Sequence, residues 1–93
     1  MPNNEAAQPA QMLKAENLIA LAEHHARATV GWKSSAELCI NDASELLLAG
    51  RYEDASGAAL RSLRYSIGIL HADFRQASEA KTFDQVPTYP DAP

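Results

Sequence analysis

The side chains best suited to binding chemistry in this 93-residue sequence are three arginines and a histidine in its second half. An arginine offers paired hydrogen-bond donors to a phosphate or a carboxylate. Gly57 and Gly68 fall on the same side of the predicted helix, where they would let a partner's backbone or a phosphate approach closely. The alternative is a solvated face whose arginines pair with nearby carboxylates. The basic residues predicted to bind a partner on this side are Arg61, Arg64, His71 and Arg75.

Six residues separate Arg64 from His71, and on one helix this spacing puts both side chains on nearly the same face, two turns apart. A helical hairpin that carries this pair resembles the HEPN domains, which are small helical nucleotide-binding or nuclease domains. The resemblance implies an RNA-cleaving or nucleotide-handling domain in which His71 exchanges a proton and Arg64 stabilises phosphate charge. Tyr65 replaces the polar residue that commonly follows the arginine in these domains.

Residues 46–62 have Gly50 in a turn between helices, Tyr52 at the start of the second helix and Ala55 one turn later. This pattern resembles the middle of a tetratricopeptide repeat, and the resemblance implies peptide or protein binding. Asp42 stands at a position that is usually apolar, and no second copy follows at a spacing of about 34 residues. We interpret the segment as a degenerate, repeat-like helical hairpin.

The remaining histidines, His24 and His25, do not have the spacing of a metal site. Neighbours on a helix point about 100 degrees apart, so both cannot bind one ion without distortion. We expect His24 to be solvated and His25 to be packed or hydrogen-bonded. The sequence contains no phosphate-binding glycine loop and no recognised nucleophile arrangement. It therefore predicts no catalytic residue, no metal site, no cofactor and no enzyme activity.

Length and composition favour a small acidic domain that has protein partners. The chain is 46% apolar, which allows one domain with a modest core that self-association would help to stabilise. A net charge of −4 argues against binding nucleic acid over the whole surface. Cys39 is the only cysteine, which we expect to be buried as a small apolar residue in a reducing compartment. With no leader sequence and no segment of about twenty apolar residues, the sequence predicts a cytoplasmic protein that does not enter a membrane.

Apolar periodicity predicts an all-α fold, a three-helix up-down-up bundle with flexible ends. Residues 1–8 are predicted to be a flexible lead, residues 9–80 a single helical domain, and residues 81–93 a flexible tail that contains prolines. Ser34 and Glu37 form a predicted capping box, so the second helix should start near Ser35. The third helix should run over residues 52–80. Its apolar stripe is Leu60, Leu63, Ile67, Leu70, Phe74 and Ala77, and we expect Phe74→Ala or Leu70→Ala to be the most damaging change.

Two further sets of apolar residues are candidates for partner contacts. Leu38 and Leu48 fall outside the predicted inner face of the second helix. Phe83 and Tyr89 lie in the tail, which is either a short docking peptide or a disordered end. We therefore predict a non-catalytic interaction module, such as an adaptor, an assembly factor or an inhibitor, which forms a homodimer. The alternatives are the RNA-cleaving domain and a purely structural oligomer.

Overall fold

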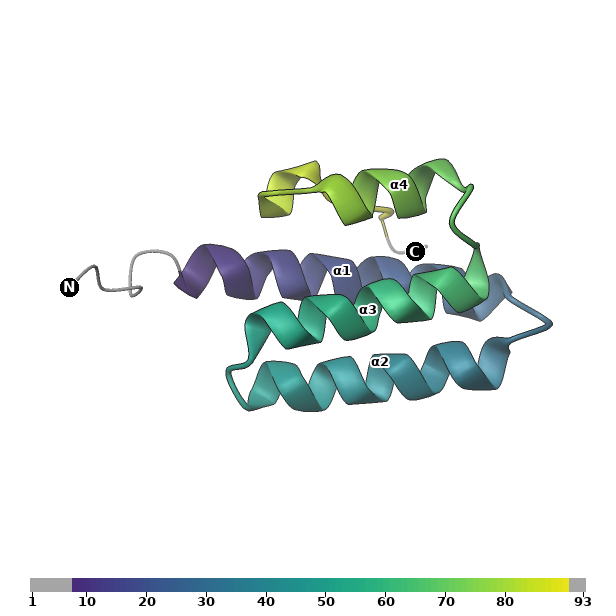
Figure 1. The fold of residues 1–93 in the computed structure, drawn as a ribbon, viewed down its shortest axis with the longest axis horizontal. Helices are drawn as coiled ribbons and strands as arrows, with labels where there is room; N and C mark the ends of the chain where they lie inside the picture. The colour runs from purple at the N-terminus through teal and green to yellow at the C-terminus, as the bar shows by residue number, and fades with distance from the viewer. Residues whose placement is uncertain (1–7, 91–93) are drawn as a thin grey trace.

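The computed structural model describes residues 8–90, and within them the chain forms four α-helices, one short 3-10 helix and no strand. Helices α1, α2 and α3 lie side by side, and α4 lies on the side of α1 that faces away from α2 (Figure 1). The predicted all-α class is confirmed, but the predicted count of three helices is wrong. None of the helices in this range is both long and apolar enough to cross a membrane. The elements are α1 (Gln8–Ala28), α2 (Lys33–Leu48), α3 (Tyr52–Ser66), α4 (Ala72–Glu79) and the 3-10 helix η1 (Phe83–Gln85).

The core between α1, α2 and α3 combines a few leucines with many alanines. The largest fully buried apolar side chains are Leu18 and Leu21 of α1 and Leu63 of α3. Ser62 of α3 is also fully buried, and its Oγ donates a 2.8 Å hydrogen bond to the Ala36 carbonyl oxygen of α2. Small side chains let the helix backbones approach closely, and this bond then links α3 directly to α2. The buried alanines are Ala15, Ala22, Ala26, Ala36, Ala43, Ala55, Ala58, Ala59, Ala77 and Ala80.

Helix α3 ends at Ser66, so the prediction of one helix over residues 52–80 is wrong. Gly68 adopts φ +83°, a left-handed conformation that glycine takes without strain. Its amide donates to the Leu63 carbonyl oxygen at 3.2 Å, which closes the end of the helix. Gly50 also adopts a left-handed conformation, φ +78°, at the end of α2, as predicted, and its amide donates to the Leu47 carbonyl oxygen. The apolar spacing continues across Gly68, but the backbone does not.

The break removes part of the predicted apolar stripe from the core. Leu63 is fully buried, whereas Leu70 lies in the linker between α3 and α4 and is 87% exposed. Ile67 and Phe74 are only partly buried against the core. The predicted role of Leu70 in the core is therefore wrong, because the residue has left the helix that was expected to bury it.

Helix α2 begins at Lys33, two residues before the predicted start. Trp32 occupies the N-cap position, and no side chain accepts a hydrogen bond there. Ser34 consequently lies inside the first turn, so the predicted capping box does not form. Leu38 and Leu48 are exposed on this helix, as expected from their place outside its inner face. Cys39 is half-buried rather than buried.

The packed body continues past residue 80, where the sequence predicted a flexible tail. Val86 is buried in the same core cluster as Leu21 of α1. The Asn17 side chain of α1 donates a 3.0 Å hydrogen bond to the Phe83 carbonyl oxygen of η1. The Gln76 side chain of α4 donates to the Gln85 carbonyl oxygen, also at 3.0 Å. The C-terminal segment thus packs against α1, where Val86 joins the core cluster that contains Leu21.

Candidate functional site

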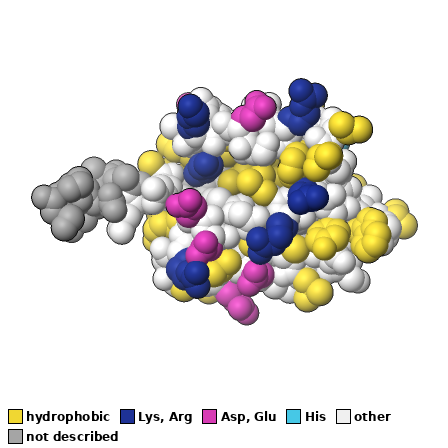
Figure 2. Space-filling view, viewed as in Figure 1, with side chains coloured by type: hydrophobic (Ala, Val, Ile, Leu, Met, Phe, Trp, Pro, Cys, Tyr) yellow, Lys and Arg dark blue, Asp and Glu magenta, His cyan; other side chains and the backbone are white. Residues whose placement is uncertain are grey.

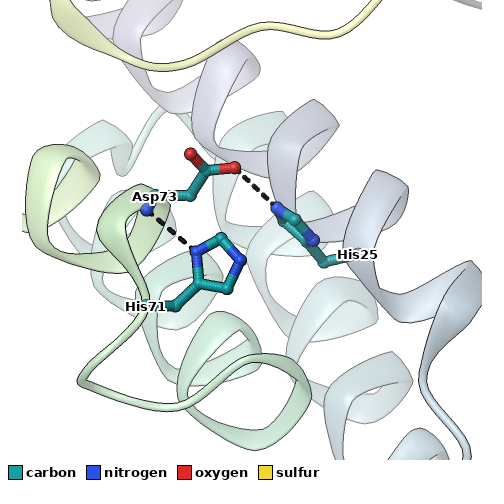
Figure 3. A group of neighbouring side chains, drawn as sticks. All are labelled: His25, His71 and Asp73. Atoms are coloured by element: carbon teal, nitrogen blue, oxygen red, sulfur yellow. Dashed lines mark hydrogen bonds and ion pairs between the residues drawn. The ribbon is translucent and has the colours of Figure 1, made fainter.

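Three polar side chains from separate segments meet between α1 and the start of α4 (Figure 3). Nε2 of His25 on α1 lies 2.9 Å from Oδ2 of Asp73 in the first turn of α4. The amide of Asp73 lies 3.0 Å from Nδ1 of His71. The rings of His25 and His71 pack edge to face with their centroids 5.3 Å apart. We call these three residues the histidine–aspartate cluster.

The hydrogen bonds of the cluster show which ring nitrogens carry protons. A carboxylate only accepts hydrogen bonds, so His25 donates to Asp73 from Nε2. The Asp73 amide is a donor, so Nδ1 of His71 accepts and carries no proton. His71 thereby caps α4 and satisfies one of the amides that have no partner within a helix. The side chains of His25 and Asp73 are only 12% and 15% exposed, so water has limited access to their contact.

Tyr89 joins the cluster from the C-terminal segment. Its hydroxyl donates a short hydrogen bond to Oδ2 of Asp73. Its ring stacks on His24, with the centroids 4.0 Å apart and the ring planes 6° from parallel. The expectation of a hydrogen-bonded His25 is confirmed. His24 differs from its prediction, because the Tyr89 ring covers one face of a side chain expected to be solvated.

Hydrogen bonding outweighs burial at the Asp73 carboxylate. Burial raises the pKa of Asp73, but the hydrogen bonds that its carboxylate accepts from Tyr89 and His25 leave this pKa below its ordinary 3.8. The bond to Asp73, with smaller effects of burial and of the Asp73 charge, raises the pKa of Tyr89 above its ordinary 10.0. At neutral pH the site therefore holds an ionised carboxylate beside a neutral phenol.

A second feature is a group of exposed apolar side chains at one end of the molecule, which we call the apolar end. It contains Val30 and Trp32 from the turn between α1 and α2, Tyr65 from α3, and Ile69 and Leu70 from the α3–α4 linker. Both connections lie at the right-hand end in Figure 1, and Figure 2 shows hydrophobic side chains gathered there. Trp32 is 64% exposed, and the centroid of its ring lies 5.9 Å from the centroid of the Tyr65 ring. Beside these rings is an open hollow of about 380 Å³.

The structure divides the basic residues that the sequence placed on one helix. Arg61 and Arg64 lie on α3, whereas His71 and Arg75 follow the break at Gly68. The predicted single face is therefore wrong. The HEPN-like arrangement of Arg64 and His71 on one helix is absent for the same reason.

The residues predicted to bind a partner lie in different local environments. Arg61 lies 3.4 Å from the Asp42 carboxylate of α2. An arginine paired with a nearby carboxylate is what the alternative, a solvated face, predicts. Arg64 and Arg75 are exposed, while His71 caps α4. Phe83 is exposed in η1, and Tyr89 contacts His24 and Asp73.

Sequence reasoning missed Asp73 and the apolar end. Asp73 is separated from His25 by 48 positions, and only the reversal of the chain before α4 brings the two together. A usable signal was present, since a glycine followed by a capping residue is typical of one helix ending and another starting. Trp32 and Tyr65 gave no periodic signal that would link them.

The fold and the two surface features define a small all-helical domain with a polar cluster on one side and an apolar end. Comparisons of the chain with protein-family models, with curated proteins and with solved structures find no match. The function must therefore be inferred from the residues themselves.

Proposed function

We propose that this protein is a non-catalytic helical interaction module that forms a homodimer through its apolar end. The observation that carries the proposal is the exposure of five large apolar side chains at one end of a small domain. Val30 is 93% exposed and Trp32 is 64% exposed, and both line the hollow together with Tyr65. Aromatic side chains are also enriched in the centres of protein interfaces.

The charge distribution supports a second copy of the chain as the occupant. The nine residues that line the hollow include no aspartate, glutamate, lysine or arginine. Because the chain has a net charge of −4, two copies repel one another, and an uncharged surface lets them approach with the least electrostatic cost. Fully burying one large apolar side chain contributes about 1.5 to 3 kcal/mol. Several such side chains from each copy can offset the association cost of about 4 to 15 kcal/mol.

If the protein is an adaptor, an assembly factor or an inhibitor, its partner binds at the same apolar end. Dissociation of the dimer then exposes this end to the partner. Cys39 has no partner for a disulfide within the chain, which supports a cytoplasmic location. In a purely structural oligomer, by contrast, the dimer itself would be the functional state.

The proposal is tested by sedimentation velocity from low micromolar to submillimolar protein concentration. We expect wild type to pass from monomer to dimer across this range. The double variant Trp32→Ser, Leu70→Ser should remain monomeric while keeping its helical circular dichroism. Both positions are exposed in the monomer, so the variant removes apolar contact area without disturbing the core.

A matched control is the double variant Leu38→Ser, Leu48→Ser, which changes two exposed leucines on α2. We expect it to dimerise as wild type does. A wild-type protein that stays monomeric at every concentration would contradict self-association. Loss of the dimer in the control alone would place the interface on α2 instead.

A further inference from the structure

We propose that His25, His71 and Asp73 bind one divalent transition-metal ion, and that zinc is the metal this donor set fits best. Each residue offers one ligand atom, and these atoms all lie within 4.8 Å of one another. Within residues 8–90, these three side chains are the group of histidine, cysteine, aspartate or glutamate residues whose ligand atoms lie this close together. It brings together α1, the α3–α4 linker and α4, so a bound ion would join segments distant in sequence.

The donor chemistry is appropriate for zinc. Two imidazoles and a carboxylate hold zinc in sites that keep a further position open for water. Imidazole nitrogen also binds copper, iron and nickel, whereas magnesium and calcium prefer sites made of oxygen atoms. Tyr89 provides a second feature of metal sites, because its hydroxyl already bonds to the Asp73 carboxylate and would orient it.

The geometry requires only local adjustment. With zinc–nitrogen bonds of about 2.0 to 2.1 Å, ligand atoms of a tetrahedral site lie about 3.3 Å apart. His25 Nε2 and Asp73 Oδ2 are 2.9 Å apart, so they need to separate by only about 0.4 Å. The widest separation of 4.8 Å must close, and His71 can move to close it because it is exposed and precedes α4. In Figure 3 the second ring nitrogen of His71 lies on the side that faces His25.

Two existing interactions change when the ion binds. The ion takes the place of the proton that His25 Nε2 donates to Asp73, and the neutral ring then carries its one proton on Nδ1. If His71 binds through its second nitrogen, the proton moves to Nδ1, and the Asp73 amide loses its acceptor. The lost interaction is a single helix cap, which is small beside the binding free energies of zinc sites. The bound ion would link α4 to α1 through its bonds to Asp73 and His25.

The test is calorimetric titration of the tag-free full chain with zinc chloride in a buffer that does not chelate metal. We expect saturable binding of one ion per chain. The variant His71→Ser removes the imidazole but keeps an oxygen able to cap α4. The variant Asp73→Asn keeps the size of the side chain and an acceptor for His25. Mutating a residue that only hydrogen-bonds to a metal ligand already weakens metal affinity by about 10- to 100-fold. Because His71 and Asp73 are proposed as ligands themselves, each variant should bind zinc at least tenfold more weakly.

Cys39→Ser is the matched control, because the Cys39 thiol is a possible zinc ligand but lies on α2, outside the cluster. We expect its affinity to remain close to that of wild type. Zinc should also raise the thermal midpoint of wild type and of Cys39→Ser, but not that of His71→Ser. Absence of saturable binding, half an ion per chain, unchanged affinity in His71→Ser and Asp73→Asn, or equal loss in Cys39→Ser would each overturn the proposal.

Discussion

The substitutions Leu63→Ala and Leu70→Ala should have very different effects on stability, although both residues belong to one apolar stripe in the sequence. Leu63 is fully buried between the helices, and Leu70 is 87% exposed after the break at Gly68. Truncating a buried leucine costs about 2 to 5 kcal/mol, because the lost transfer free energy is joined by the cost of the cavity. Truncating an exposed leucine changes stability by less than about 0.5 kcal/mol.

These magnitudes are easy to separate for a chain of this size. At about 0.05 to 0.15 kcal/mol per residue, the 93 residues give a free energy of unfolding of about 5 to 14 kcal/mol. Leu63→Ala therefore removes a large share of the total. With a urea dependence of about 2 kcal/mol per molar, a loss of 3 kcal/mol lowers the unfolding midpoint by about 1.5 M.

The assay is urea unfolding followed by circular dichroism, at low micromolar concentration so that dimer formation contributes little. Leu63→Ala should lower the midpoint strongly, and Leu70→Ala should leave it nearly unchanged. Equal destabilisation by the two changes would refute this reasoning, since it would mean that Leu70 is packed in a continuous helix.

Four further predictions concern two glycines, the Asp73 carboxylate and catalysis. Gly68→Ala should lower the free energy of unfolding by about 1 to 2 kcal/mol because alanine is strained at φ +83°. Gly57→Ala should raise it by about 0.8 to 1 kcal/mol, since Gly57 is inside α3 and an added Cβ meets nothing within 4 Å; urea midpoints measure both. The lowered pKa of Asp73 stabilises the folded state above the unfolded value of about 3.9, and this contribution disappears as pH falls through the lower folded pKa. In metal-free buffer, wild type should thus lose stability more steeply below that pH than Asp73→Asn, and parallel acid dependences would contradict this. For catalysis, we expect no RNA cleavage by wild type, and a cleavage activity that disappears in His71→Ala would support the HEPN-like alternative.

The sequence was sufficient to predict the helical class and the α2–α3 hairpin. The apolar periodicity of α1 is supported by alanines and leucines on one side, and Gly50 is a helix stop that the sequence marks clearly. Gly68 was not interpreted in this way, because Ile67, Leu70 and Phe74 continue the helical spacing across it. Periodicity reports which residues are apolar, but it does not report whether the backbone between them stays helical.

The two surface features could not be predicted for a related reason. The contact between His25 and Asp73 exists only because the chain reverses at the α3–α4 linker. Likewise, Trp32 and Tyr65 come together because the α1–α2 turn and the C-terminal end of α3 lie at the same end of the bundle. Both features depend on how helices are placed in space, which local patterns do not determine.

The most direct test of the proposed interface is the fluorescence of Trp32, the only tryptophan in the chain, measured over a dilution series. The indole is 64% exposed in the monomer, so dimer formation through the apolar end must move it into a drier environment. We predict blue-shifted emission and protection from a soluble quencher at high protein concentration, with both effects lost on dilution. Emission typical of an exposed indole, unchanged at all concentrations, would contradict an interface at the apolar end.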